Sequence, residues 1–236
     1  MTNSTQIYVR GALGTQFLSV FFLSTERDLE FNKIILSAGG NKLAEHCKIM
    51  YLWDYLEPRF YCTSEVDMQS THKSFNVNAW PEMTKEEYRE RVKEFYRKWE
   101  VNFIFGWRSG VREHDVILHA RGTDNKFLTE DKLAQIAKKY DSVAVTGEDS
   151  QLISRIQTIT DVKNISTDDP VYDWYTLQNA KEVHGGCSTF MLSAAMLSPE
   201  TQFVFYQTPD MNPNSKIISD RIVSVLDNAR IECFGH

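Results

Sequence analysis

The sequence lacks most of the features that mark membrane, secreted or zinc-stabilised proteins. No apolar run approaches the roughly 20 residues that a membrane-spanning helix needs. The N-terminus, MTNSTQIYVRG, does not place a basic region before an apolar stretch as a secretory signal does. The four cysteines form no CxxC pair and have no histidine at zinc-finger spacing. We therefore expect a soluble, cytoplasmic protein with free thiols and no structural zinc.

Basic charge is also scarce. The formal net charge of −6 argues against a protein whose whole surface binds nucleic acid. Proline and glycine are few, at six and eleven of 236 residues, and neither repeats nor low-complexity segments are evident. The 42% of hydrophobic residues is enough to form the core of one large domain or two small ones.

Predicted strands and helices alternate along the C-terminal half of the chain. Short apolar runs predict strands at 115–120, 142–146, 162–166, 182–184 and 202–206. Helices are predicted between and after them, at 130–140, 150–157, from TDDPVYD through Lys181, at 189–197 and at 215–228. This alternation is typical of a parallel sheet with helices on both faces.

The N-terminal half shows a similar but weaker pattern. Strands are predicted at 6–9 and 33–38, with a tight glycine-containing loop and a buried helix, FLSVFFL, between them. A helix is expected at 41–56 and irregular structure at 57–83. Thr84 is predicted to cap a helix over 85–99 whose buried stripe is Tyr88, Val92, Phe95 and Trp99. We expect two α/β halves, 1–110 and 111–236, facing each other across a cleft.

Polar loops follow the predicted strands of the C-terminal half: HARGTD, TGEDS, STDDPVYD and HGGCST. The carboxyl ends of parallel strands meet at one edge of a sheet, where ligands bind. The GGCST segment begins a helix and can hold an anion, while Arg121 can clamp the same phosphates with two hydrogen bonds. Carboxylates that can accept hydrogen bonds from a base or from sugar hydroxyls are Glu148, Asp149, Asp168, Asp169 and Asp173. Together these groups suit a nucleotide-sugar.

Each of these features also has a structural explanation when it is taken alone. Gly–Gly before Ser–Thr is common at an ordinary helix start, and Arg121 could form a structural ion pair. Asp168–Asp169–Pro170 is typical of a turn, and His119 could be a core histidine. The order and spacing of all four loops therefore carry the hypothesis.

That order resembles the fucosyltransferase superfamily. RGALGTQFLSVFF is similar to its Gly-x-Leu-Gly-Asn-Gln-Leu/Met-Phe loop, LHARGTD to its His-x-Arg-Arg-Gly-Asp motif, and TGED to the acidic loop after the next strand. The segment Tyr172–Pro199 is similar to the last motif, in which an Asp-led helix precedes a short strand and Ser-Thr/Ser-Phe. The resemblance covers about 110–210 closely and 7–22 in part.

The resemblance implies a GT-B fold and an enzyme that transfers a fucose-like sugar, with inversion, from a nucleoside-diphosphate donor to a glycan or other hydroxyl acceptor. It implies no metal and no cofactor besides the donor. Arg121 would bind the diphosphate and favour its departure, with His119 beside the donor as the second catalytic residue. The other donor-binding residues would be Gly11, Gly14, Thr15, Gln16, Asp124, Glu148, Asp149, Asp173, Gly186, Ser188, Thr189 and Phe190.

The sequence departs from the family pattern at three places. Gly122 stands where a second Arg is usual, Thr123 precedes Asp124, and Thr15 replaces Asn. These departures leave the sugar and the base open. The general base is not assigned, and its acidic candidates in the N-terminal half are Asp28, Glu30, Glu65 and Asp67.

Two alternatives stay open. A phage-type enzyme that glycosylates a hydroxymethylated base in DNA would fit residues 85–112, where eight Lys/Arg stand against five Glu. However, Glu86, Glu90 and Glu94 interrupt the basic face, as in a solvated helix with internal ion pairs. The second alternative is a non-catalytic nucleotide-binding module on the same fold.

Overall fold

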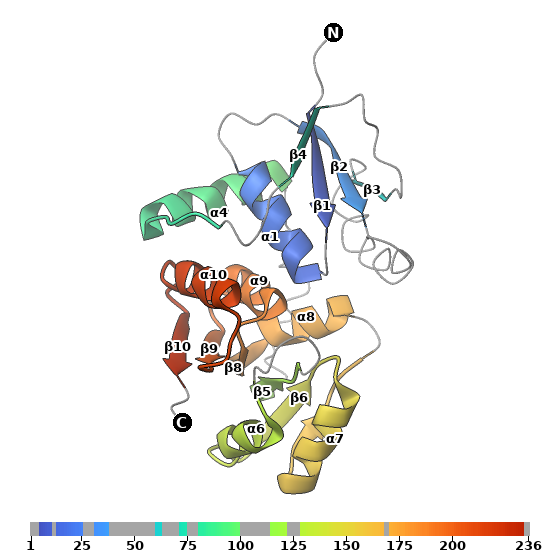
Figure 1. Cartoon of the computed structure of the whole chain (residues 1–236), viewed down its shortest axis with the longest axis vertical. Coiled ribbons are helices and arrows are strands. Elements are labelled where there is room, and N and C mark those ends of the chain that lie inside the picture. Colours follow the sequence, from blue (N-terminus) through green and yellow to red (C-terminus); the bar gives the residue numbers. More distant parts are fainter. Residues whose placement is uncertain are drawn as a thin grey trace. The chain divides into compact units, whose positions relative to one another are not determined.

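The computed structural model describes residues 5–10, 13–25, 31–37, 60–62, 71–74, 80–99, 114–121, 128–167 and 170–233. The chain divides into two compact units, Met1–Ser109 and Gly110–His236. Each unit has its own parallel sheet and its own helices (Figure 1).

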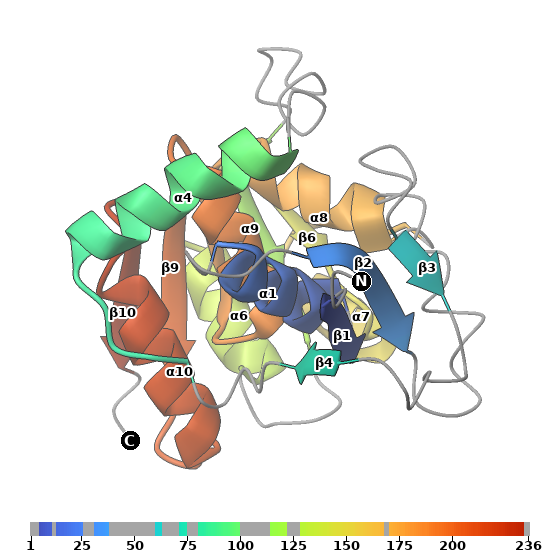
Figure 2. The same ribbon diagram turned by 90° about the horizontal axis from the view of Figure 1, so that it is seen from above.

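Unit 1 is built on four parallel strands in the order β3-β2-β1-β4 (Figure 2). The strands are β1 (Thr5–Arg10), β2 (Phe31–Ser37), β3 (Phe60–Cys62) and β4 (Thr71–Ser74), and the helices are α1 (Leu13–Ser24) and α4 (Lys85–Trp99). The predicted strand, helix and strand at the N-terminus are confirmed. The irregular structure predicted for 57–83 is wrong at β3 and β4, because strands this short show no alternation and are defined only by pairing with β2 and β1. The helix predicted at 41–56 lies outside the described residues.

Aromatic side chains join α1 to α4 in unit 1. The ring of Phe95 lies 5.6 Å from that of Phe17 and 5.3 Å from that of Phe21, and all three side chains are buried. Thr84 caps α4 as predicted, because the Glu87 N–H donates to its hydroxyl and its own N–H donates to the Glu87 carboxylate. The predicted buried stripe of α4 is confirmed at Tyr88 and Phe95.

Unit 2 contains six parallel strands in the order β10-β9-β8-β5-β6-β7. They are β5 (His114–His119), β6 (Val143–Thr146), β7 (Lys163–Asn164), β8 (Ala180–Gly186), β9 (Gln202–Gln207) and β10 (Ala229–Cys233). The helices are α6 (Glu130–Ala137), α7 (Ser150–Ile159), α8 (Pro170–Gln178), α9 (Thr189–Leu197) and α10 (Pro213–Val223). The predicted strands 115–120, 142–146 and 202–206 therefore lie parallel in one sheet, as expected.

Several boundaries in unit 2 differ from the prediction. Helix α8 ends at Gln178 rather than Lys181, because the chain enters β8 at Ala180 and pairs there with β5. Gly185 and Gly186 belong to that strand rather than to the loop before α9. Helix α10 ends at Val223 rather than at 228. The strand β10 was not predicted, although its charged residues alternate with apolar ones as in a half-buried strand, and it pairs with β9.

The helices of unit 2 lie on both faces of the sheet. Right-handed crossovers place α6 and α7 on one face and α8, α9 and α10 on the other, as Figure 1 shows. Apolar side chains fill the space under α6 and α7, among them Leu118, Val145, Leu133 and Ile153. His119 and Thr146 end their strands on the opposite face, which packs against α8 and α9.

Candidate functional site

All strands of unit 2 are parallel, but the direction in which the chain adds strands to the sheet reverses between β5 and β8. From β5 the chain proceeds through α6 to β6 on one side, whereas from β8 it proceeds through α9 to β9 on the other. The carboxyl ends of two such neighbouring strands are the usual ligand site of an open parallel sheet. His119 at the end of β5 is the register partner of Gly185 near the end of β8. Arg121, the predicted diphosphate ligand, follows His119 in the chain, and the start of α9 follows Gly185.

The junction of β8 and α9 is closely packed against β5. A Cβ atom on Gly185 would lie 2.8 Å from the Met191 Sδ and 3.1 Å from the His119 Cβ. Ser188 is the N-cap of α9, and its hydroxyl accepts a hydrogen bond from the Met191 N–H at 3.2 Å. Helix α9 spans the predicted residues 189–197 and begins with Thr189 and Phe190. Its first N–H groups attract anions, so the predicted phosphate-binding residues lie at a suitable helix start.

His119 is buried beside this helix start. Its ring stacks on Phe190 with the centroids 5.4 Å apart and the planes inclined by 14°. Burial, assisted by the nearby Arg121 cation, lowers the pKa of His119 to about 3. The imidazole is therefore neutral at neutral pH. Among the described residues, its Nδ1 atom has no hydrogen-bond partner.

Thr146 continues the same row of residues and was missed by the sequence analysis. It is the register partner of His119 on β6 and is fully buried. Its hydroxyl oxygen also lacks a hydrogen-bond partner within the described part of the chain. A buried polar atom without a partner costs about 1–3 kcal/mol, so a ligand that hydrogen-bonds to either atom would relieve that cost. The available sequence signal was a hydroxyl residue at the end of the apolar strand VAVT.

The TGED loop after β6 brings Glu148 to Arg121. The Arg121 Nε lies 3.2 Å from the Glu148 Oε1. Gly147 makes this approach feasible, because its φ is +154° and a Cβ there would lie 1.9 Å from the Ala120 carbonyl oxygen. The Gly147 N–H also donates to the Ser166 hydroxyl at 3.1 Å. The two loops at the ends of β5 and β6 are thus held together.

Two of the predicted carboxylates have structural hydrogen bonds. Asp149 caps α7, where its Oδ1 accepts from the Leu152 N–H at 2.9 Å. Asp173 is buried, and its Oδ1 accepts from the backbone N–H and the hydroxyl of Thr167 at 3.0 and 2.8 Å. These bonds fix the loops around the site, and the donor-binding role of both residues stays a prediction.

The remaining predicted residues lie in unit 1, at the end of β8 in unit 2, or at positions that are not described. Gly14, Thr15 and Gln16 follow β1 in the first turn of α1, so this part of the expected loop is helical. Gly186 is the last residue of β8. Outside the described residues lie Gly11, Asp124, Asp168, Asp169 and the four candidate bases Asp28, Glu30, Glu65 and Asp67.

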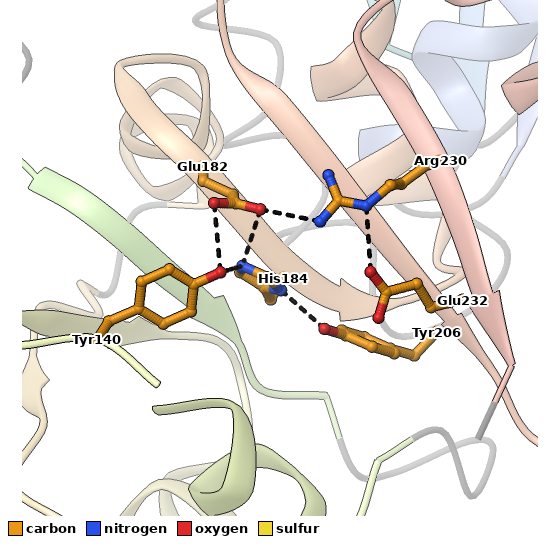
Figure 3. Close-up of polar contacts among 6 residues, drawn as sticks. All are labelled: Tyr140, Glu182, His184, Tyr206, Arg230 and Glu232. Atoms are coloured by element: carbon orange, nitrogen blue, oxygen red, sulfur yellow. Dashed lines mark hydrogen bonds and ion pairs between the residues drawn. The ribbon is translucent and has the colours of Figure 1, made fainter. Parts of the chain in front are cut away.

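A second polar cluster lies on the α6 and α7 face of the sheet, as Figure 3 shows. His184 is buried, with its Nε2 3.0 Å from the Tyr140 hydroxyl and 3.3 Å from the Glu182 carboxylate, and its Nδ1 2.9 Å from the Tyr206 hydroxyl. A carboxylate only accepts hydrogen bonds, which assigns the proton to Nε2 and makes Nδ1 the acceptor from Tyr206. Arg230 pairs with Glu182 and with Glu232 at 3.2 and 3.1 Å.

We expect His184 to make stability depend on pH. Burial lowers its pKa from 6.5 to about 4, although the Glu182 carboxylate opposes the shift. Between these values the unfolded chain holds a proton that the folded protein lacks, so the free energy of unfolding decreases as the pH falls. This residue alone should remove about 2 kcal/mol between pH 7.5 and pH 5. Urea unfolding of His184→Gln should show a weaker pH dependence, whereas His114→Gln, in the same sheet, should retain it; equal pH dependence in both variants would contradict this assignment.

Neither a metal cluster nor a membrane helix is found in the described part of the chain. No group of three or more His, Cys, Asp or Glu side chains there could hold a metal ion. Among the described helices, none is long and apolar enough to cross a membrane.

Comparison with known proteins identifies the fold. No family model and no curated protein matches the sequence. The structure is similar to that of the Escherichia coli heptosyltransferase WaaC with ADP, with a TM-score of 0.56 and 9% identity over 98% of this chain and 93% of WaaC. It is also similar to the E. coli ADP-heptose lipopolysaccharide heptosyltransferase II, with a TM-score of 0.50 and 12% identity over 97% of this chain and 90% of that one. The chain has a GT-B fold. The predicted fold class is thereby confirmed.

Proposed function

We propose that this protein is a glycosyltransferase that uses a nucleoside-diphosphate sugar. The observation that carries the proposal is that Arg121 and the start of α9 follow the adjacent carboxyl ends of β5 and β8, where the strand order reverses. A guanidinium and a set of helix N–H groups suit a diphosphate. The solved structures with the same fold are heptosyltransferases, one of them with ADP bound, which supports this class of donor.

In the proposed mechanism the sugar leaves the diphosphate as an acceptor hydroxyl attacks. Negative charge grows on the diphosphate, and Arg121 with the N-terminus of α9 stabilises that charge. The neutral His119, stacked on Phe190, lies beside the donor and contributes a hydrogen bond rather than a positive charge. The general base that takes the acceptor proton is not among the residues that this proposal assigns.

The motif resemblance extends the proposal to details of the reaction. The extended proposal is that the enzyme transfers a fucose-like sugar, inverts the configuration at the transferred carbon, and needs no metal. The nucleoside is left to experiment, because the resemblance favours GDP whereas the structural neighbours bear ADP or ADP-linked ligands.

The helix that suggested a DNA acceptor offers little support for it. On α4, Lys93 pairs with Glu90 and Arg97 pairs with Glu94, each at 2.6 Å. Such pairs partly neutralise the basic face that a DNA backbone would need. The DNA-modifying enzyme therefore remains the alternative.

A thermal-shift panel tests the proposal directly. ADP, GDP, UDP and CMP, each alone and as its sugar conjugate, are added in buffer with EDTA and again with Mg²⁺ or Mn²⁺. We expect one nucleotide family to raise the unfolding temperature in EDTA, since a ligand at 100 times its Kd adds about 2.7 kcal/mol of stability. Hydrolysis or transfer of the matching sugar would establish the enzyme. Binding without turnover would favour a nucleotide-binding module, no binding at all would contradict the proposal, and a strict requirement for metal would contradict its metal-independent form.

A further inference from the structure

We infer that Glu148 does not contact the donor but positions Arg121 for the diphosphate. The inference rests on the proposed function. It replaces the role that the sequence suggested for Glu148, which was to accept hydrogen bonds from the base or the sugar hydroxyls of the donor. The Glu148 Oε1 lies 3.2 Å from the Arg121 Nε, so the ion pair involves the Nε side of the guanidinium. The guanidinium can also bind end-on through its two Nη atoms. The N–H groups of these two atoms are spaced to donate to two oxygens of one phosphate.

Several contacts of the backbone deliver Glu148 to this place. The Ala120 N–H donates to the Thr146 carbonyl at 2.8 Å, which joins the ends of β5 and β6. Gly147 then passes so close to Ala120 that no Cβ fits between them, and its N–H is held by Ser166. Asp149 caps α7 immediately afterwards. Glu148 is thus held on both sides by residues whose positions are fixed.

The solvent exposure of Glu148 indicates that the ion pair orients the Arg121 side chain rather than stabilises the fold. The Arg121 side chain is 22% exposed, whereas that of Glu148 is 59% exposed. An ion pair with one partner this exposed contributes little to folding stability. It can still restrict the rotation of a long side chain, and a guanidinium held in its binding orientation loses less freedom when the ligand arrives.

A double-mutant cycle separates positioning from direct contact. Affinity is measured by calorimetry for the nucleoside diphosphate that gives the largest shift among ADP, GDP and UDP. We expect Glu148→Ala to weaken binding about tenfold in the native background and to have almost no effect in the Arg121→Ala background. Glu148→Gln, which keeps the length of the side chain but removes the charge that pairs with Nε, should recover only part of the lost affinity. A full tenfold loss in the Arg121→Ala background would show that Glu148 contacts the ligand itself and would overturn the inference.

The matched control is Glu130→Ala. Glu130 on α6 pairs with Arg155 on α7 at 3.4 Å, another Arg–Glu pair of the same unit that does not involve Arg121. This variant should bind the diphosphate like the native protein, and both alanine variants should unfold within about a degree or two of it. A large loss of stability in Glu148→Ala alone would assign a folding role instead. If the native protein binds none of the diphosphates, the proposed function fails; if it binds and Glu148→Ala binds equally well, only this inference fails.

Discussion

Replacing Arg121 with lysine is expected to leave the protein folded and to remove most of its transferase activity. A lysine keeps the positive charge but loses the planar fork that can contact two phosphate oxygens and, in this structure, the Nε that pairs with Glu148. Because charge on the diphosphate grows as the sugar leaves, the loss should appear mainly in kcat. We expect a decrease of about a hundredfold, equivalent to about 2.7 kcal/mol of transition-state stabilisation.

The measurement uses the donor that the thermal-shift panel identifies. Steady-state kinetics separate kcat from KM, and urea unfolding checks that the Arg121→Lys variant retains its stability. Arg155→Lys, which alters the exposed pair with Glu130, is the matched control and should keep native kinetics. Near-native turnover of Arg121→Lys would remove the main support for the proposed mechanism.

Replacing Gly147 with alanine is expected to destabilise unit 2 more than any other single methyl addition at the site. The added carbon would lie 1.9 Å from the Ala120 carbonyl oxygen and 2.8 Å from its carbonyl carbon, and both are backbone atoms that cannot rotate away. The φ of +154° is also unfavourable for a residue with a side chain. We expect the free energy of unfolding to fall by about 3 kcal/mol, with loss of diphosphate binding as the two loops separate.

Gly185→Ala provides the comparison for that variant. Its added carbon would meet the Met191 Sδ at 2.8 Å, the flexible end of a side chain, and the His119 Cβ at 3.1 Å. Methionine can adopt another rotamer, so the loss of stability should be about 1 kcal/mol. Urea unfolding of both variants tests the order of the two effects. Equal stabilities, or a Gly147→Ala protein as stable as the native one, would contradict the steric argument.

The sequence by itself determined the elements whose signals are local. Helix α9 has the predicted bounds, and Thr84 caps α4 as predicted, because a cap and its first turn are adjacent in the chain. The long apolar strands and their alternation with helices were also readable, and they led to the α/β fold. Loops such as HARGTD and TGEDS could be assigned to one sheet edge because parallel strands share their carboxyl ends.

Only the tertiary structure decided which side chains at that edge meet. Thr146 and His119 are 27 positions apart in the sequence, as are Glu148 and Arg121, and their pairing depends on the register of β5 with β6. The polar cluster around His184 likewise depends on residues from the turn after α6, from β9 and from β10, and β10 itself was not predicted. Strand order and register follow from contacts between distant segments, for which a single sequence carries no local pattern. For that reason the sequence placed Glu148 in the site, while the fold directed its carboxylate to Arg121.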